Sequence, residues 1–260
     1  ALAVFHGGAT RADLAAILGE DDAPDTPASA ALDDALEALD TASLLRLDAE
    51  ADRYQVERLV ANWAQQWGPA HADDGYWDRL FHRHAAHFLK AARQYAAHDP
   101  REWPEHDREW ENVRAAARRV SVWNETAAPA PTDAALAAGY ALALRDLVRI
   151  RRPADGERWL RAGARALGNT GRAADEGWLR LTLGSLALES GNLEQAVTDF
   201  ERAAALFEQA SDAKGARYAA GNLGRVHRLR GEYEEALASF TRTSELCAAA
   251  GDRYGVAIGE

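Results

Sequence analysis

The sequence predicts an all-α protein with one small β-hairpin, and its second half is expected to form a solenoid of helical repeats. One stretch occurs twice: "GNLEQAVTDFERAAALFEQASD" starts at Gly191, and "GEYEEALASFTRTSELCAAAGD" starts forty residues later at Gly231. Apolar residues within each stretch recur at spacings of three and four, which is typical of amphipathic helices. Helical units that cannot bury an apolar face alone stack into a solenoid.

The period of forty divides the second half of the chain into three complete units, 131–170, 171–210 and 211–250. A fourth unit starts at residue 251 and is truncated at residue 260. Each complete unit is expected to be a helix–turn–helix hairpin.

Residues of three kinds recur at fixed places in the units. Gly191 and Gly231 are expected to adopt the left-handed backbone conformation that ends a first helix. Gly184 and Ala196 are expected to let the two antiparallel helices of a unit approach closely. Phe200 and the equivalent phenylalanine one period later are expected to fill the space toward the next unit.

This pattern resembles the tetratricopeptide repeat, in the forty-residue form found in large bacterial signalling proteins, over about half of the chain. The resemblance implies that the first helix of each pair lines a groove that holds a protein or peptide. By register, the residues on that face are Trp178, Ser185, Leu188, Tyr218, Asn222, Arg225 and Arg228.

Three residues of this face carry the binding hypothesis. Asn222 occupies a position at which such repeats often hydrogen-bond an extended peptide backbone. Arg225 and Arg228 are three apart on one helix face and form a donor pair suited to a carboxylate or to acidic side chains. The alternative is that the same residues are ordinary solvated surface, and the sequence leaves both interpretations open.

The first 68 residues do not repeat and predict a different module. Thr10 with Asp13 three places later indicates a capping box, and Thr26 followed by Pro27 indicates the start of a second helix. The stretches "LLRL" and "RYQV", on either side of "DAEAD", predict a short hairpin, and "ERLVANWAQQW" predicts a closing helix. Helices followed by a hairpin predict a winged helix-turn-helix over residues 1–68.

Charge argues against DNA binding by this module. Residues 1–68 contain thirteen acidic residues and four arginines, which gives a charge of −9, whereas the whole chain carries −11. The helix that would enter the major groove carries Asp33, Asp34, Glu37 and Asp40 and no basic residue. Because DNA binding depends on neutralising phosphates, a transcription regulator that binds DNA directly is the least favoured alternative.

The stretches "AVFHGGATRADLAAIL", "ALDDALEALDTASLLRLD" and "RYQVERLV" resemble, in that order, the winged-helix module of STAND NTPases, the signal-transduction ATPases with numerous domains. "LFHRHAAHFLKAARQY" and "EWENVRAAARRV", within the helical connector 69–130, resemble the segment that joins this module to repeats in bacterial members. The resemblance implies a sensor region that is linked to an upstream nucleotide-binding domain, where ATP or ADP would bind. A constitutive repeat adaptor without a nucleotide switch is the alternative.

Two features depart from that family's pattern. No Walker A sequence occurs in the chain, so the residues given contain no ATPase and no cofactor site of their own. Where the family often carries Met-His-Asp, with a histidine that contacts the nucleotide phosphates, this chain has Val56, Glu57 and Arg58. Glu57 cannot donate to a phosphate, so we interpret it as structural, with Arg58 as the alternative contact.

Side chains with catalytic or metal-binding potential have simpler interpretations. His82, His84 and His87 lie in "FHRHAAH", and although a metal site is conceivable, surface or packing histidines are favoured. Cys247 is expected to be buried filler. Because no nucleophile elbow, zinc-protease motif or phosphate loop occurs, no enzyme activity is expected from these residues.

Large aromatic residues gather in the middle of the sequence. They are expected to pack the winged helix against the repeats, with an aromatic ligand cage as the alternative. The residues concerned are Trp63, Trp67, Trp77, Trp103, Trp110 and Trp123.

Composition sets the remaining expectations. A single cysteine favours a reducing, cytoplasmic location, and no apolar run approaches the ~18 residues of a membrane span. The chain contains no Met, which suggests a piece of a longer protein. The expected partners are a protein or peptide ligand and the upstream nucleotide-binding domain, without nucleic acid or membrane.

Overall fold

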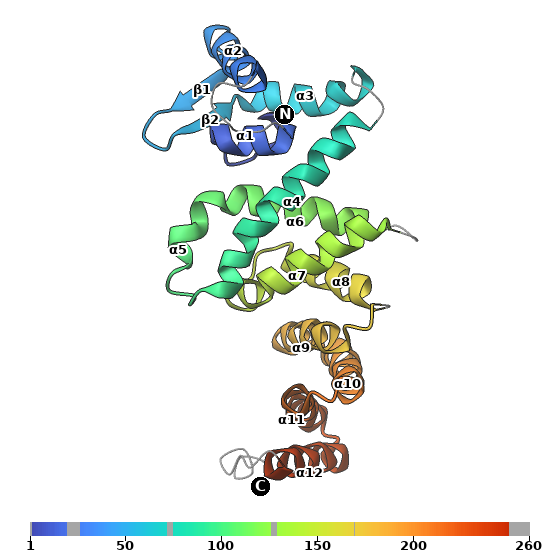
Figure 1. Ribbon diagram of the computed structural model, residues 1–260. Coiled ribbons are helices and arrows are strands. Elements are labelled where there is room, and N and C mark those ends of the chain that lie inside the picture. Colours follow the sequence, from blue (N-terminus) through green and yellow to red (C-terminus); the bar gives the residue numbers. More distant parts are fainter. Residues whose placement is uncertain (1, 20–26, 72–74, 126–128, 169, 250–260) are drawn as a thin grey trace. The chain divides into compact units, whose positions relative to one another are not determined.

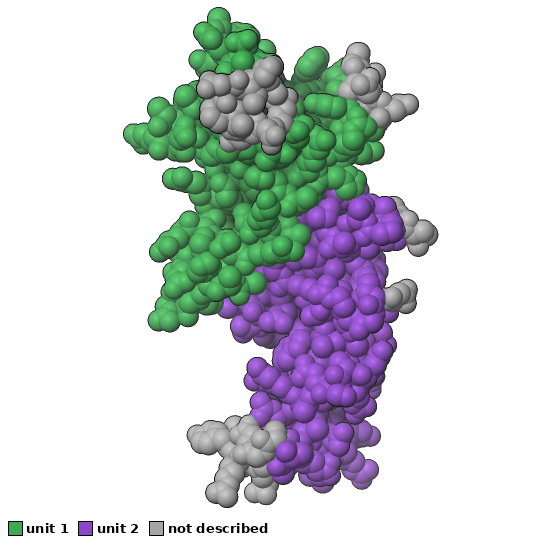
Figure 2. Space-filling view, in the orientation of Figure 1, with its two compact units in different colours: residues 1–120 green, residues 121–260 purple. Residues whose placement is uncertain are grey.

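The structure is a computed structural model that describes residues 2–19, 27–71, 75–125, 129–168 and 170–249. The described residues are mostly helical, with one two-stranded sheet, as the sequence predicts (Figure 1). The chain divides into two compact units, residues 1–120 and 121–260 (Figure 2).

Unit 1 is a mixed unit of helices and one hairpin. Its elements are η1 (Leu2–Val4), α1 (Arg11–Leu18), α2 (Pro27–Thr41), β1 (Leu45–Asp48), β2 (Arg53–Val56), α3 (Arg58–His71), α4 (Tyr76–Ala97), α5 (Trp103–His106), η2 (Asp107–Glu109) and α6 (Trp110–Trp123), whose last residues belong to unit 2.

The capping box at the start of α1 is confirmed. The Thr10 hydroxyl accepts a hydrogen bond from the Asp13 backbone N–H, and the Asp13 carboxylate accepts from the Thr10 backbone N–H at 2.8 Å. Gly19 ends the helix in the left-handed conformation, with φ of 79°. Both helix ends therefore have partners for backbone groups that the helix itself leaves open.

The hairpin is also confirmed. β1 and β2 pair antiparallel, with Leu45 opposite Val56 and Asp48 opposite Arg53. Ala9 forms a bridge to the outer edge of β2, because its N–H and C=O both bond to Tyr54. Thr26 lies outside the described residues, so its role before α2 is not described. The closing helix starts at Arg58, one residue later than predicted.

Arg53 and Asn112 join the hairpin, the N-terminal segment and the start of α6. The Arg53 guanidinium donates to the carbonyls of Gly7 and Gly8, at 3.1 and 2.7 Å, and forms an ion pair with Glu109. Asn112, which is fully buried, accepts from the backbone N–H groups of His6 and Gly7 and donates to the Gly8 carbonyl at 3.0 Å. Arg53 is therefore an internal cross-link, and only 3% of it is exposed.

Unit 2 continues with helices that follow one another as antiparallel pairs (Figure 1). They are α7 (Pro131–Arg151) with α8 (Gly156–Leu167), α9 (Ala173–Glu189) with α10 (Leu193–Gln209), and α11 (Ala213–Arg230) with α12 (Tyr233–Ala249). The truncated fourth unit expected from residue 251 lies outside the described residues.

Residues with positive φ mark the turns of these pairs at a period of forty. Gly191 and Gly231 have φ of 80° and 78°, which confirms their left-handed conformation. Between pairs, Gly171 and Ser211 have φ of 74° and 55°. A left-handed conformation at a residue with a Cβ, as at Ser211, costs about 1 kcal/mol of backbone conformational energy. The packing of the adjacent helix pairs must offset this cost.

Two phenylalanines of α10 fill the space between helices, and the structure divides their roles differently from the prediction. The Phe200 ring lies against Gly184 of its own pair, where an added Cβ would come within 2.7 Å of the ring. The ring that meets glycines on both α9 and α11 is Phe207, which lies against Gly177 and Gly215. Phe207 therefore fills the wedge toward the next pair, because two glycines remove the side chains that would otherwise hold the helices apart.

Candidate functional site

The candidate surface is the face formed by the first helix of each pair, α7, α9 and α11. α7 contacts α9, and α9 contacts α11, so equivalent positions on these helices follow one another across the face. Trp178 and Tyr218 are equivalent by the period of forty, as are Thr182 and Asn222. We call this surface the first-helix face.

The first-helix face has two aromatic rings in contact at its centre. The centroids of Trp178 and Tyr218 lie 6.0 Å apart, with an angle of 62° between the rings. The Phe207 ring packs against Trp178 with 5.1 Å between the ring centroids, and Trp178 Nε1 donates to the Asp212 carboxylate at 3.1 Å. Tyr218 is 44% exposed. A rigid, half-open aromatic pair of this kind is a surface suited to contact with another chain.

Basic side chains surround the two rings. The Arg145 guanidinium lies 5.5 Å from the Trp178 centroid, and the Lys214 ammonium lies 6.0 Å from it. The Arg217 guanidinium lies 5.2 Å from the Tyr218 centroid. Sequence reasoning missed these three residues, because register alone does not say which neighbouring cation reaches a ring. For two of them a signal was available, because Lys214 lies one helical turn before the exposed Tyr218 and Arg217 lies next to it.

Asn222 and Arg225 lie together on the same face. Asn222 Nδ2 donates to the Tyr218 carbonyl at 2.9 Å, and its Oδ1 accepts from Arg225 at 3.1 Å. An asparagine amide has two donor hydrogens and two acceptor lone pairs, so one of each remains for a ligand. Thr182, the equivalent of Asn222, likewise donates to the carbonyl four residues earlier, that of Trp178, at 3.0 Å.

The other three predicted residues are placed less directly for binding. The Ser185 hydroxyl donates to the Leu181 carbonyl at 2.9 Å, and Leu188 packs against the apolar core around Phe200. Arg228 is exposed, and no hydrogen bond or ion pair joins its side chain to another described residue. The structure therefore brings Trp178, Tyr218, Asn222 and Arg225 together and leaves these three at the margin.

The junction between β2 and α3 contains the candidate nucleotide-contacting residues. Val56 ends the strand and is half-buried, whereas Glu57 and Arg58 are exposed at the start of the helix. The Glu57 carbonyl accepts the Ala61 N–H at 3.0 Å, as expected for a residue that precedes a helix. A nucleotide contact by these residues stays a prediction.

The three histidines of α4 point toward different partners. His82 contacts its own helix at the Asp78 carbonyl, and His87 contacts the Asp13 carboxylate at 2.8 Å. His84 is buried between the rings of Phe5 and Phe88. Burial, with smaller contributions from the positive charges of His6 and His87, lowers the pKa of His84 to about 3. Within the described ranges, no three His, Cys, Asp or Glu side chains come together as a possible metal site.

The tryptophans and the cysteine differ in how far they follow the expectation. Trp103 donates to the Tyr95 carbonyl at 2.9 Å, and Trp110 lies against the Tyr95 ring, so both pack within unit 1. Trp63 and Trp67 on α3 are 64% and 51% exposed, and packing at the junction stays a prediction for these two. Cys247 is buried, as predicted.

Comparison with known proteins supports the repeat interpretation. Residues 175–249 match the family of the tetratricopeptide repeat. No curated protein and no solved structure matches the chain. No helix in the described part of the chain has the length and apolar character needed to cross a membrane. Tetratricopeptide repeats are non-catalytic modules that bind proteins, and the match therefore indicates a protein-interaction role for this region.

Proposed function

We propose that the first-helix face binds a segment of another protein and that acidic side chains of that segment are recognised there. The observation that carries this proposal is the contact between Trp178 and Tyr218, with Arg145, Lys214 and Arg217 at the rings. Aromatic and arginine side chains dominate binding energy in protein interfaces. The surrounding positive charges favour an acidic partner by attraction during the encounter.

The amide of Asn222 supports binding of an extended segment. These two bonds leave one N–H and one lone pair of the amide unused, and both can bond to the backbone of a bound chain. Arg225 and Arg228, three residues apart, remain the proposed pair for an acidic side chain or a carboxylate. Ser185 and Leu188 are proposed to contact the same segment at the margin of the face.

We further propose that this region is the sensor of a STAND-type signalling NTPase, with unit 1 containing a winged helix that relays the binding event. The succession of α1, α2 and the β1–β2 hairpin, with Ala9 bridged to Tyr54, supports a winged helix. A partner would shift the population between two arrangements of the sensor relative to an upstream nucleotide-binding domain. The shift is limited to the difference in the partner's affinity for the two arrangements.

A constitutive adaptor is the second candidate, because the family match covers residues 175–249 and extends to no part of unit 1. The coding sequence upstream of Ala1 separates the two: a Walker A motif there supports the nucleotide-dependent switch, and an upstream sequence without one supports the adaptor. DNA recognition by unit 1 is disfavoured. Asp33, Asp34, Glu37 and Asp40 on α2 are exposed, and Arg53, a basic residue of the hairpin, is buried.

Partner capture tests the binding proposal. The 260-residue chain is immobilised and exposed to extract of the source cell, and bound proteins are identified by mass spectrometry. The double variant Asn222→Ala/Arg225→Ala is compared with Thr241→Ala/Arg242→Ala, which removes one polar group and one arginine from exposed positions of α12. We expect a partner that is retained by the wild type and the α12 variant and lost by the first-helix variant. A partner retained equally by all three proteins would contradict the proposed face.

A further inference from the structure

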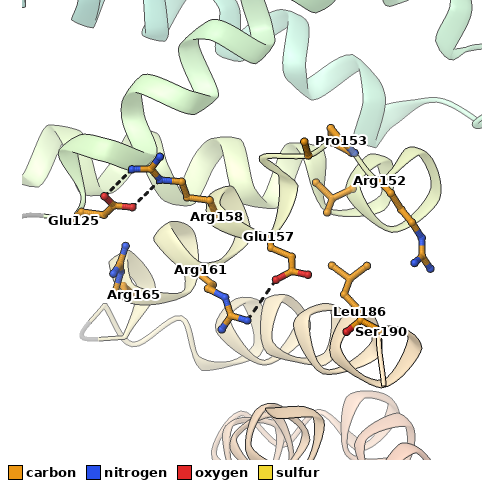
Figure 3. A pocket seen from close by; sticks show the side chains of 11 residues that line it. Glu125, Arg152, Pro153, Glu157, Arg158, Arg161, Arg165, Leu186 and Ser190 are labelled. Carbon is orange, nitrogen blue, oxygen red and sulfur yellow. Dashed lines mark hydrogen bonds and ion pairs between the residues drawn. The ribbon is translucent and has the colours of Figure 1, made fainter. Parts of the chain in front are cut away.

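A second surface in unit 2 combines a cavity with arginines. The cavity has a volume of about 700 Å³ and is lined by the α7–α8 turn, by α8 and by the end of α9 (Figure 3). This volume lies within the range of about 300–1,000 Å³ that is typical of small-ligand sites. The cavity shares none of its lining residues with the first-helix face.

The cavity has an apolar side and a basic side. Val148, Leu186 and Pro153 provide the apolar surface, and the first two are buried. Arg158, Arg161 and Arg165 provide the basic surface, at helical spacings of three and four along α8. Figure 3 shows Arg158 directed toward Glu125 and Arg161 toward Glu157, while Pro153, Leu186 and Ser190 lie on the other side of the view.

The three arginines of α8 differ in how far their charges are already satisfied. Arg158 donates to both oxygens of Glu125, at 2.7 Å each, and this ion pair raises the pKa of Arg158. Arg161 is only loosely paired, because its nearest carboxylate oxygens lie 3.6 Å away on Glu157 and 4.0 Å away on Asp199. The Arg165 side chain forms no hydrogen bond or ion pair with any residue that the structure describes.

We propose that this cavity binds a phosphate monoester, with Arg161 and Arg165 as the residues that hold the phosphate. The two arginines are four residues apart on one helix, so their Cα atoms lie about 6 Å apart along its axis on the same face, and their long side chains can converge on one group. A phosphate monoester presents three acceptor oxygens and a charge of about −2, which matches two guanidinium forks better than a single carboxylate does. The ion pair with Glu125 holds Arg158 in place, so Arg161 and Arg165 remain to bind the ligand.

The apolar side of the cavity adds a requirement on the rest of the ligand. Val148, Leu186 and Pro153 can bury an apolar or aromatic body attached to the phosphate. An aryl phosphate is therefore expected to bind more tightly than inorganic phosphate. The phosphate can be part of a small molecule or of a phosphotyrosine side chain, and both share the chemistry that the cavity recognises.

Calorimetric titration at constant ionic strength tests the proposal with inorganic phosphate, phenyl phosphate, phenol and a short phosphotyrosine peptide. The 260-residue chain is compared with Arg161→Gln/Arg165→Gln and with Arg225→Gln/Arg228→Gln, which removes two charges from the first-helix face. We expect phenyl phosphate to bind at one site and to lose at least about tenfold in affinity in the α8 variant only. Circular dichroism of both variants verifies that the helices are retained.

The outcomes separate cleanly. Equal affinity of phenyl phosphate and the peptide indicates that the cavity recognises the phosphate and its ring, and at least about tenfold tighter binding of the peptide indicates a protein source. Either result supports the site if the α8 variant loses affinity for these ligands. Unchanged binding in the α8 variant, a loss in the α11 variant instead, or phenyl phosphate binding no tighter than phenol overturns it. None of these results depends on the partner of the first-helix face.

Discussion

Trp178 and Tyr218, which are forty residues apart in the sequence, contact each other ring to ring with their centroids 6.0 Å apart. The same period that builds the helix pairs thus places two aromatic side chains side by side on the first-helix face. Asp212 and Phe207 hold Trp178 in this position, so the pair is fixed before any partner arrives. A preorganised contact surface reduces the entropy that binding costs.

Replacing the more exposed ring separates binding from stability. We expect Tyr218→Ala to lower partner affinity by at least about tenfold, because central aromatic residues dominate interface energy. The free energy of unfolding should fall by only about 1 kcal/mol, since nearly half of the residue is exposed. Tyr233→Ala is the matched control: Tyr233 is 71% exposed at the start of α12 and should leave affinity unchanged. Equal losses in both variants would refute a specific role for Tyr218.

The close packing between α10 and α11 depends on a missing side chain. A Cβ at Gly215 would come within 2.2 Å of the Phe207 ring, so we expect Gly215→Ala to destabilise unit 2 by about 2 kcal/mol. Gly221→Ala places its Cβ 3.7 Å from Thr243, in ordinary contact, and should stabilise α11 by up to about 1 kcal/mol. Urea unfolding of both variants measures the difference. A Gly215→Ala chain as stable as the wild type would show that Phe207 moves freely.

The polar cross-link of unit 1 should be essential for its stability. Asn112→Ala removes the acceptor for the His6 and Gly7 N–H groups and the donor to the Gly8 carbonyl. Because these backbone groups then lack partners in a buried site, we expect a loss of about 3 kcal/mol. Chemical unfolding followed by tryptophan fluorescence measures it, with Asn62→Ala on the exposed surface of α3 as the control. A loss below about 0.5 kcal/mol in Asn112→Ala would show that water replaces the amide.

Burial of His84 makes unit 1 sensitive to acid. The pKa of His84 falls from 6.5 in the unfolded chain to about 3, chiefly because of burial and also because His6, His87 and Arg119 are positive while only Asp13 opposes them. The unfolded state therefore binds the proton first. The stabilisation is complete above pH 6.5 and is lost as the pH falls toward 3, by up to about 5 kcal/mol.

Replacement of the buried ring tests this dependence. His84→Phe keeps the contacts with Phe5 and Phe88 and should flatten the loss of stability between pH 6.5 and pH 4, whereas His82→Gln should keep the wild-type profile. Thermal unfolding measured across this pH range distinguishes them. If the slopes of wild type and His84→Phe are the same, another group controls the acid response.

The sequence predicts the parts of this fold that depend on local chemistry or on repetition. The capping box of Thr10, the hairpin that ends at Val56 and the left-handed Gly191 and Gly231 each depend on a few neighbouring residues. The helix pairs follow from apolar spacing, because a helix that must bury one face shows that face in its sequence.

Contacts between distant residues could not be predicted in this way. Arg53 looks like a surface charge of the hairpin, and only the folding of Glu109 against it makes it internal. Asp199 is fully buried on α10, where Arg180 of α9 and Gln195 satisfy its carboxylate at 3.0 and 2.8 Å. From the sequence alone, a charged residue beside the apolar stripe of a helix is expected to be exposed. Only a contact with a distant partner, such as Arg180, shows that it is buried.

In the candidate site, too, the period of the helix predicts some features, whereas others depend on contacts between distant residues. The sequence places Trp178, Tyr218, Asn222 and Arg225 on one face, because residues of one helix face follow from its period. The positions of Arg145, Lys214 and Arg217 over the rings depend on rotamers and on neighbouring helices. The sequence likewise does not predict that the Ser185 hydroxyl donates to the Leu181 carbonyl of its own helix.

The central claim, that a protein partner occupies the first-helix face, is tested most directly by site-specific photocrosslinking. Tyr218 is replaced by the photoreactive p-benzoylphenylalanine, and in a second protein Tyr233 is replaced in the same way. Both are exposed aromatic positions, on α11 and α12 respectively. After irradiation with the captured partner, we expect a covalent product from position 218 and none from position 233. A product from position 233 alone, or equal yields from both positions, would contradict the account.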